Sequence, residues 1–369
     1  MVVVDPHPVY PPDLRCEKLD REQVAVLRRT GLADIVLAAA THDRECWVAR
    51  FGRVVEKRPG DQYGILYVDL VNTMRAAIAA PASLLVGKVV AVDNAGDRQA
   101  VTLSGGRTLR ARLVIVANGL NSGLRGAIGM SREDISRCHS ITLAFNLAPA
   151  QRKAFEFGAL TYYGERTSDR AAYITLFPIG RAMRANLFVY RPLGDPWLRQ
   201  VRDDPDAALA ALMPGLSRVT GPAHVASPVL VRPADLYITR DYLQPGIVLV
   251  GDAFGTSCPA AGTGADKVLT DVERLCNVYI PRWMATPGMG VDKIARFYAD
   301  PVKQDCDRRS FREAFHQRSL AIDDGWSWRA ERWARFLARA TIGTARSAWR
   351  WLPVRGDLVP PTGESHEPR

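Results

Sequence analysis

The sequence predicts an α/β protein with a helical C-terminal part, and three observations predict it. Residues 247–250 form a short apolar strand that stops at a Gly-Asp pair and leads through a Pro- and Gly-rich turn into a helix. Residues 1–5 read as a second short parallel strand, which also ends in an acid. Four strand-like runs follow one another between residues 140 and 190, whereas residues 291–369 show helical spacing and then a loose tail.

The remaining elements follow from local patterns. Helices are predicted over 69–80 and 267–279, where apolar residues recur every three to four positions. Strands are predicted for runs bounded by Gly, Asn or Pro. These runs are 46–55 as a strand pair, 84–92, 99–103 and 109–116 as an antiparallel meander, and 140–147, 159–163, 172–177 and 185–190.

Size and composition indicate an ordinary globular protein. The 369 residues suffice for two joined domains, since a domain typically holds about 100–200 residues. No apolar run is long enough to span a membrane, and the N-terminus has no basic segment ahead of an apolar core. We therefore expect a cytoplasmic protein. The six cysteines form no C-x-x-C pair and no Cys/His spacing that suits zinc, so we expect no metal site.

The net charge of +10 is concentrated near the C-terminus. Residues 326–355 contain seven arginines and one acid, interleaved with tryptophans. No nucleic-acid-binding motif accompanies this charge, so we expect no nucleic-acid partner. Two interpretations remain open. The segment is either a helix that lies on an anionic membrane surface, or a helix that covers the domain with its arginine stems.

The turn after residues 247–250 has the residues of a ligand site. Packing does not require an acid directly after a buried strand, or Gly262 and Gly264 where the next helix begins. Glycines let backbone N–H groups approach a ligand closely, and a helix N-terminus favours negative charge. The Asp252 carboxylate can accept hydrogen bonds from a polyol.

This stretch resembles the Gly-Asp motif of FAD-dependent aromatic hydroxylases of the para-hydroxybenzoate hydroxylase type, which include the ubiquinone-biosynthesis hydroxylases. The resemblance implies that Asp252 binds the ribityl chain of FAD, while the Pro-Gly turn lies along the isoalloxazine edge. The cofactor-binding residues that it implies here are Gly251, Asp252, Pro259, Gly262, Thr263 and Gly264.

A second motif supports the resemblance. Residues 118–125 are similar to the family's D-G-x-x-S-x-x-R motif, with Asn118 in place of the aspartate and with Gly119 and Arg125 retained. The family motif serves both flavin and nicotinamide binding, so these three residues are expected to bind cofactor. Because Asn118 carries no charge, the use of the nicotinamide nucleotide is expected to be altered or weakened.

The N-terminal residues match the family from its second strand onward. Asp5 corresponds to the acid that binds the adenosine ribose, residues 15–32 to the next helix, and Arg15 to an arginine that holds the flavin. Tyr67 occupies a neighbourhood where the family often has another arginine. The family's first strand, its G-x-G-x-x-G turn and its first helix would precede Met1, and no G-x-G-x-x-G occurs in the sequence. We expect a misassigned start, with a truncated relative as the alternative.

The resemblance implies an FAD-binding Rossmann-like domain of the glutathione-reductase type and an interleaved mixed-sheet substrate domain. The expected boundaries are 1–35, 67–135 and 245–290 for the first domain, 36–66 and 136–244 for the second, 291–355 for C-terminal helices and 356–369 for a loose tail. Four aromatic residues of the second domain either line a substrate pocket or belong to the core. They are Tyr162, Tyr173, Phe177 and Phe188.

The implied activity is that of an NAD(P)H-driven, FAD-dependent monooxygenase. Such an enzyme uses O₂, through a flavin C4a-hydroperoxide, to hydroxylate an aromatic or isoprenoid-type substrate. The flavin carries the chemistry, so the sequence identifies no catalytic residue. The alternatives are an FAD-dependent reductase of polyprenyl lipids and a degenerate, non-catalytic homologue that binds lipid or a partner.

Overall fold

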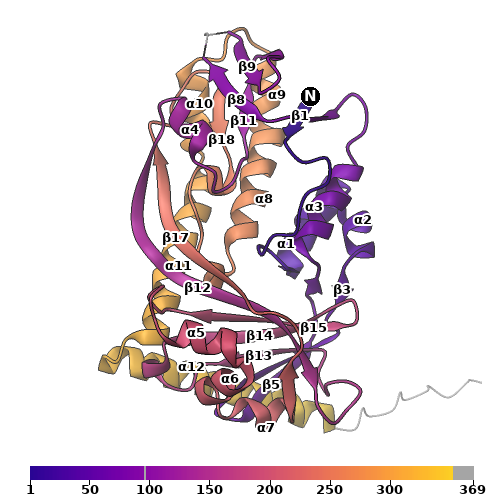
Figure 1. The fold of residues 1–369 in the computed structure, drawn as a ribbon, viewed down its shortest axis with the longest axis vertical. Coiled ribbons are helices and arrows are strands. Elements are labelled where there is room, and N and C mark those ends of the chain that lie inside the picture. Colours follow the sequence, from indigo (N-terminus) through magenta and orange to yellow (C-terminus); the bar gives the residue numbers. More distant parts are fainter. Residues whose placement is uncertain (95–96, 352–369) are drawn as a thin grey trace, which may run out of the picture.

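A computed structural model describes residues 1–94 and 97–351 of the chain (Figure 1). Its largest element is an eight-stranded mixed sheet with the order β16-β12-β15-β14-β13-β4-β5, in which β17 also pairs with β12. The predicted strand pair at 46–55 is the antiparallel hairpin of β4 and β5. The strands of this sheet are β4 (Glu45–Arg50), β5 (Arg53–Pro59), β12 (Ser131–Pro149), β13 (Ala159–Tyr163), β14 (Ala171–Ile179), β15 (Ala182–Val189), β16 (Ala223–Val225) and β17 (Leu230–Arg240).

The two faces of this sheet bury different partners. One face packs against α5 (Trp197–Asp203), α6 (Pro205–Leu212) and α7 (Leu216–Thr220), and Tyr162 lies fully buried in that core. Phe177 is 1% exposed in a smaller cluster with Cys46 and Ala159. Tyr162 and Phe177 are therefore core residues. The other face presents Phe188 and Tyr173 toward α11 (Pro301–Ile322) and the turn at 258–261.

The parallel strands form two separate pairs. Strand β1 (Val2–Asp5) pairs with β7 (Ser83–Val86), and β11 (Val114–Val116) pairs with β18 (Ile247–Leu249). The prediction of a three-strand meander is wrong for its first and last strands, 84–92 and 109–116. The first run divides into β7 and β8 (Val89–Asp93), and the last divides into β10 (Thr108–Ala111) and β11. Only β8, β9 (Gln99–Leu103) and β10 form the antiparallel sheet, because β7 and β11 turn away to join parallel partners.

The N-terminal helices pack on a small sheet. Helix α1 (Arg21–Thr30) begins later than expected, because Asp20 and Gln23 form a capping box there. Arg15 therefore lies in the extended segment before the helix. Helix α3 (Tyr67–Ala76) ends four residues before the expected position, ahead of Pro81. The other elements of this region are β2 (Lys18–Leu19), α2 (Ala33–Ala38), β3 (Thr41–His42) and β6 (Tyr63–Gly64). Outside this region, the short helix α4 (Gly123–Ala127) follows β11.

The C-terminal part is helical, as predicted. Helix α8 (Gly264–Arg274) continues through a π-helical turn at 275–279 into α9 (Ile280–Met284), and α10 (Val291–Tyr298) leads to α11, which packs along α8. Helix α12 (Trp326–Trp351) lies against β5, where Trp333 and Phe336 contact the Phe51 ring. In the described ranges no helix is long and apolar enough to cross a membrane. The expected loose tail at 356–369 lies outside them.

Candidate functional site

Strand β18 ends at a turn that only glycine fits. Gly251 adopts φ +57°, and a Cβ at this position would lie 2.8 Å from the Val268 Cγ2 atom. The Gly251 N–H donates to the Asp271 carboxylate on α8 over 2.8 Å. The strand, the turn and the helix after it are therefore fixed to one another directly beside Asp252.

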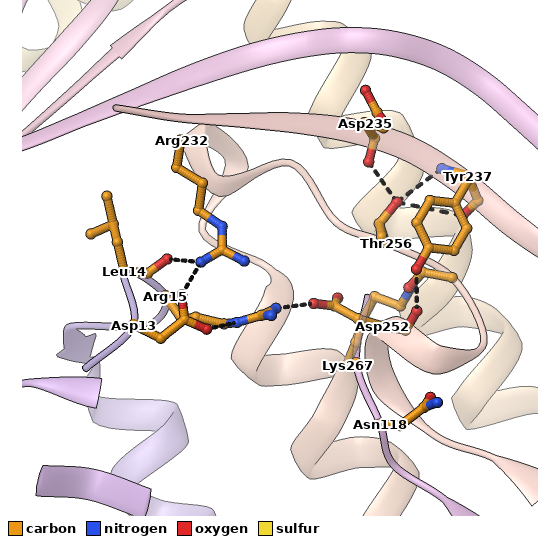
Figure 2. Close-up of polar contacts among 12 residues, drawn as sticks. Asp13, Leu14, Arg15, Asn118, Arg232, Asp235, Tyr237, Asp252, Thr256 and Lys267 are labelled. Carbon is orange, nitrogen blue, oxygen red and sulfur yellow. Dashed lines mark hydrogen bonds and ion pairs between the residues drawn. The ribbon is translucent and has the colours of Figure 1, made fainter. Parts of the chain in front are cut away.

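The Asp252 carboxylate is the centre of a chain of charged groups (Figure 2). It lies 3.1 Å from an Arg15 guanidinium nitrogen, and its side chain is 32% exposed. Arg15 also donates to Asp13 over 2.7 Å. Arg232 on β17 contacts the same Asp13 and donates to the Leu14 carbonyl over 2.6 Å. The structure thus brings together Arg15 and Asp252, which lie 237 positions apart in the sequence.

Arg125 is held by the turn that the second motif forms. Its side chain is almost fully buried and donates to the Asn118 Oδ1 atom over 2.9 Å and to the Gly119 carbonyl over 2.8 Å. A third donor bonds the Tyr237 hydroxyl over 3.1 Å, and this hydroxyl donates to the Asp252 carbonyl over 3.1 Å. Asn118 therefore supplies a neutral acceptor that orients Arg125, and Tyr237 joins the two motifs.

Two glycines with positive φ lie in the turns of the two motifs. Gly119 adopts φ +59°, and a Cβ there would point at the Arg15 guanidinium from 3.8 Å. Gly262, which follows the 3₁₀ turn Pro259–Ala261, adopts φ +71°, and a Cβ there would meet no atom within 4 Å. Pro259 is exposed at the start of this turn. A flat ligand edge could lie along this backbone without meeting side chains.

The structure separates two other expected residues from this cluster. Asp5 accepts from the His7 N–H over 2.8 Å and forms an ion pair with Arg75 at 3.7 Å. The Thr263 hydroxyl bonds Ser310 on α11 over 2.7 Å, so this side chain fastens α8 to α11. Gly264 is the first residue of α8.

Sequence reasoning missed several residues of the cluster. Asp13, Arg232 and Tyr237 carry no motif. Arg232 and Tyr237 lie on β17, whose long-range pairing with β12 places them beside Asp13 and Arg125. Tyr67 begins α3 close to Arg15, and burial raises the pKa of its hydroxyl to about 12. Residues 231–237 do not alternate regularly between polar and apolar types, so no local pattern marks Arg232 or Tyr237.

Asp271 links α8 to the end of β18 through its bond to the Gly251 N–H. The Lys303 ammonium group on α11 lies 2.7 Å from the other Asp271 oxygen, with the two side chains 1% and 2% exposed. Burial raises the pKa of Asp271, and the Lys303 charge opposes that shift. A lysine in the polar pattern of a long helix gives no sequence signal of such a role.

Comparison with known proteins gives consistent matches. The family described as FAD binding domain matches residues 1–279. The 3-demethoxyubiquinol 3-hydroxylase of Escherichia coli (strain K12) is 29% identical over 290 residues, which cover 73% of this chain and 69% of that protein.

Solved structures share the fold. The p-nitrophenol 4-monooxygenase PnpA from Pseudomonas putida DLL-E4 gives a TM-score of 0.69 at 16% identity, over 95% of this chain and 89% of that one. Klebsiella pneumoniae HpxO, solved with FAD and uric acid, gives 0.67 at 15% identity, over 91% and 86%. With the glycine turns and the Asp252 cluster in place, the chain belongs to the FAD-binding-domain family of para-hydroxybenzoate hydroxylase-type flavoproteins and is an FAD-dependent monooxygenase.

Proposed function

We propose that this monooxygenase is driven by NAD(P)H and hydroxylates an aromatic ring, with its flavin held at the Asp252 cluster. The observation that carries the proposal is the meeting of Arg15, Gly119 and Asp252, which come from three distant segments of the chain. The same proposal extends to Asp5 at the ribose and to the Pro259–Gly264 backbone at the ring edge. It also includes the two interleaved domains with the boundaries given above.

The residues present fit the ribityl and ring parts of FAD. Asp252 offers a carboxylate oxygen to a polyol, and Arg15 lies where it can donate to the same group. The missing Cβ atoms at Gly119 and Gly262 leave room for a close approach. When bound, FAD supplies the redox chemistry, taking a hydride from the nicotinamide and activating O₂.

The chain's own residues position the reactants. Asn118 holds Arg125 in one orientation, so this buried cation faces the cofactor side. Among the described residues, no carboxylate lies within ion-pair distance of it. The Tyr173 hydroxyl donates to the Ala260 carbonyl over 2.6 Å, which fixes the turn against the sheet. This sheet face, the turn and α11 pack into one hydrophobic cluster, and such apolar surroundings would shield a ring beside the flavin edge from water. The quinol-type ring in the E. coli relative's name supports an aromatic substrate.

The first test is reconstitution of the purified chain with FAD, followed by its visible spectrum. We expect flavin absorption in the wild type. Asp252→Ala should bind FAD at least about tenfold more weakly than the wild type, because a charge-assisted hydrogen bond is lost. Asp305→Ala, at a side chain that is 76% exposed, is the matched control and should bind FAD normally. Equal affinity in Asp252→Ala and the wild type would contradict the placement of the flavin.

Turnover separates the proposed activity from its alternatives. We expect phenols to stimulate NADH or NADPH oxidation, with matching O₂ uptake and a product that is one oxygen atom heavier. Reduction of a polyprenyl substrate without O₂ uptake would instead indicate the reductase. Failure to bind flavin in any form would indicate the non-catalytic homologue.

We also propose that α12 touches an anionic membrane surface. Trp326, Trp333 and Leu337 lie on one helix face and are 84%, 55% and 56% exposed. Such an apolar stripe on an arginine-rich helix fits an interfacial helix, which would bring an isoprenoid-type substrate to the site.

Vesicle sedimentation tests this second proposal. We expect the chain to pellet with phosphatidylglycerol vesicles, and the double variant Trp326→Ser/Leu337→Ser to stay in the supernatant. Leu193→Ser, at an equally exposed apolar side chain elsewhere, should still pellet. Loss of pelleting in both variants, or in neither, would refute the assignment to α12.

A further inference from the structure

Four charged side chains lie between α8 and α11, behind the turn that presents Asp252. Two of them stand one helical turn apart on α8, and the other two stand one turn apart on α11. They are Lys267, Asp271, Lys303 and Asp307. The first three side chains are at most 7% exposed, and that of Asp307 is 25% exposed. Two ammonium groups and two carboxylates give the set no net charge.

Asp307 is the carboxylate that the two lysines share. One of its oxygens lies 3.4 Å from the Lys267 ammonium nitrogen, and the other lies 3.1 Å from that of Lys303. The Lys303 nitrogen also lies 2.7 Å from Asp271. A buried charge is stable only when it is paired, so the loss of one member leaves an uncompensated charge between the two helices.

This network holds both ends of the turn that contains Asp252. At the first end, Asp271 accepts from the Gly251 N–H over 2.8 Å. At the second end, the Lys267 ammonium group donates to the Gly255 carbonyl over 2.8 Å. Within the turn, the Gly255 N–H bonds the Gly251 carbonyl over 3.1 Å. The ends of the turn are therefore fixed to α8 by two groups of opposite charge, in addition to the bond inside the turn.

The two helices contribute different parts of this arrangement. Helix α8 supplies both groups that bond the turn, and α11 supplies the two charges that pair with them. Hydrogen bonds that involve a charged group are short and strong, so they fix the position of the backbone that they contact. A shift at either end would move the Asp252 carboxylate away from Arg15, and a binding group must be held to about 0.5 Å to act.

We propose that Lys267 and Asp307 are positioning residues of the flavin site, which keep the turn in the shape that places Asp252 at the ribityl chain. The proposal rests on the proposed function, because it takes this turn to be the flavin-binding turn. It adds that part of the affinity for FAD depends on Asp307, which lies on α11 beyond the residues 1–279 that the family model matches.

Fluorescence titration of the full chain with FAD is the first test. Lys267→Met should bind FAD about tenfold more weakly than the wild type, because the Gly255 carbonyl loses its donor. Asp307→Asn should also bind FAD more weakly, because both lysines lose their shared carboxylate. Asp307→Glu keeps the charge and should bind like the wild type. The matched control is Asp305→Asn on the same helix, at a side chain that is 76% exposed, and it should also bind like the wild type.

The double variant Lys267→Met/Asp307→Asn separates positioning from stability. It removes one charge of each sign, so the melting temperature of its flavin-free form should return close to the wild-type value. Its affinity for FAD should stay about tenfold weaker, because the Gly255 carbonyl still lacks its donor. Recovery of affinity together with the melting temperature would overturn the proposal, and so would wild-type affinity in Lys267→Met.

Hydrogen exchange of the flavin-free chain, followed by mass spectrometry, tests the turn itself. Peptides that cover residues 251–256 should exchange faster in Lys267→Met than in the wild type, and Asp305→Asn should leave them unchanged. A wild type that binds no FAD, with a turn that still loosens in Lys267→Met, would refute the proposed function and support the role of the network. A wild type that binds FAD, with exchange and affinity unchanged in Lys267→Met, would refute this inference alone.

Discussion

Lys303 and Asp271 illustrate how single side chains fix the cofactor turn. The pair is buried between α8 and α11, and the same carboxylate receives the Gly251 N–H. A buried charge is tolerated only when it is paired, so each partner depends on the other. The shape of the Gly251 turn thus depends on Lys303, whose ammonium group also lies 4.4 Å from the centre of the Phe254 ring at the end of that turn.

Replacing Lys303 by methionine leaves Asp271 as an unpaired buried carboxylate. We expect Lys303→Met to lose about 3–5 kcal/mol of unfolding free energy, measured by urea denaturation. The double variant Asp271→Asn/Lys303→Met removes that charge and keeps an acceptor for Gly251, so it should recover most of the stability. A single variant that unfolds at the wild-type urea concentration would contradict this account.

His139 makes stability depend on pH. Its buried ring contacts the Ala314 carbonyl over 3.1 Å and faces Tyr190, Phe315 and the charge of Arg318. Burial lowers the pKa of this imidazole below its ordinary value of 6.5. Below pH 6.5 the imidazole is protonated in the unfolded chain but stays neutral in the folded protein. The stability that this group contributes is therefore present above about pH 6.5 and is lost as pH falls through the folded pKa.

Melting temperatures between about pH 7 and 5 test this prediction. We expect the wild-type melting temperature to fall more steeply over this range than that of His139→Gln. His224→Gln, on the exposed strand β16, should follow the wild type. Parallel curves for all three proteins would show that His139 does not titrate differently on folding.

At the scale of elements, the sequence predicts what local pattern determines. The strand–turn–helix at 247–274, the hairpin of β4 and β5 and the strands of the mixed sheet follow from apolar spacing and turn residues. The strands β7 and β8 could not be separated, because only two residues divide them and the parallel partner of β7 is a distant segment.

In the site, too, local sequence patterns predict some residues, whereas others are placed by contacts between distant segments. Glycines and the acid after β18 are visible in the sequence, because turns and ligand contacts demand particular residue types at particular spacings. The contact of Arg232 with Asp13 and that of Tyr237 with Arg125 depend on how β17 crosses the molecule. Such contacts join ordinary residues, so no local pattern marks them.

The two parallel pairs should open more easily than the mixed sheet. In the described ranges β1 pairs only with β7, and β11 only with β18, while Val2 and Ile115 are 51% and 39% exposed. Hydrogen exchange followed by mass spectrometry should show β1 and β11 exchanging well before β14, which is paired on both sides. Equal protection of β1 and β14 would contradict the two-stranded arrangement.

Across the whole molecule, two long strands connect the sheet to the parallel pairs. Strands β12 and β17 run together from the mixed sheet toward β18 and α4 (Figure 1). Helix α11 runs beside α8 and also reaches β14. The proposed flavin turn is therefore supported by the same sheet and the same helix, and Tyr173 on the sheet donates a hydrogen bond to the Ala260 carbonyl of that turn.

The position of Lys303 also limits which part of the chain can act as an autonomous module. The family match ends at residue 279, whereas the ammonium group that balances Asp271 is supplied by α11. A chain truncated after Ala299 would carry both motifs, yet it should neither retain FAD on gel filtration nor stay monodisperse. Residues 1–279 placed alone in another protein would therefore carry both motifs but would lack Lys303 on α11, which balances the charge of Asp271 beside the Gly251 turn.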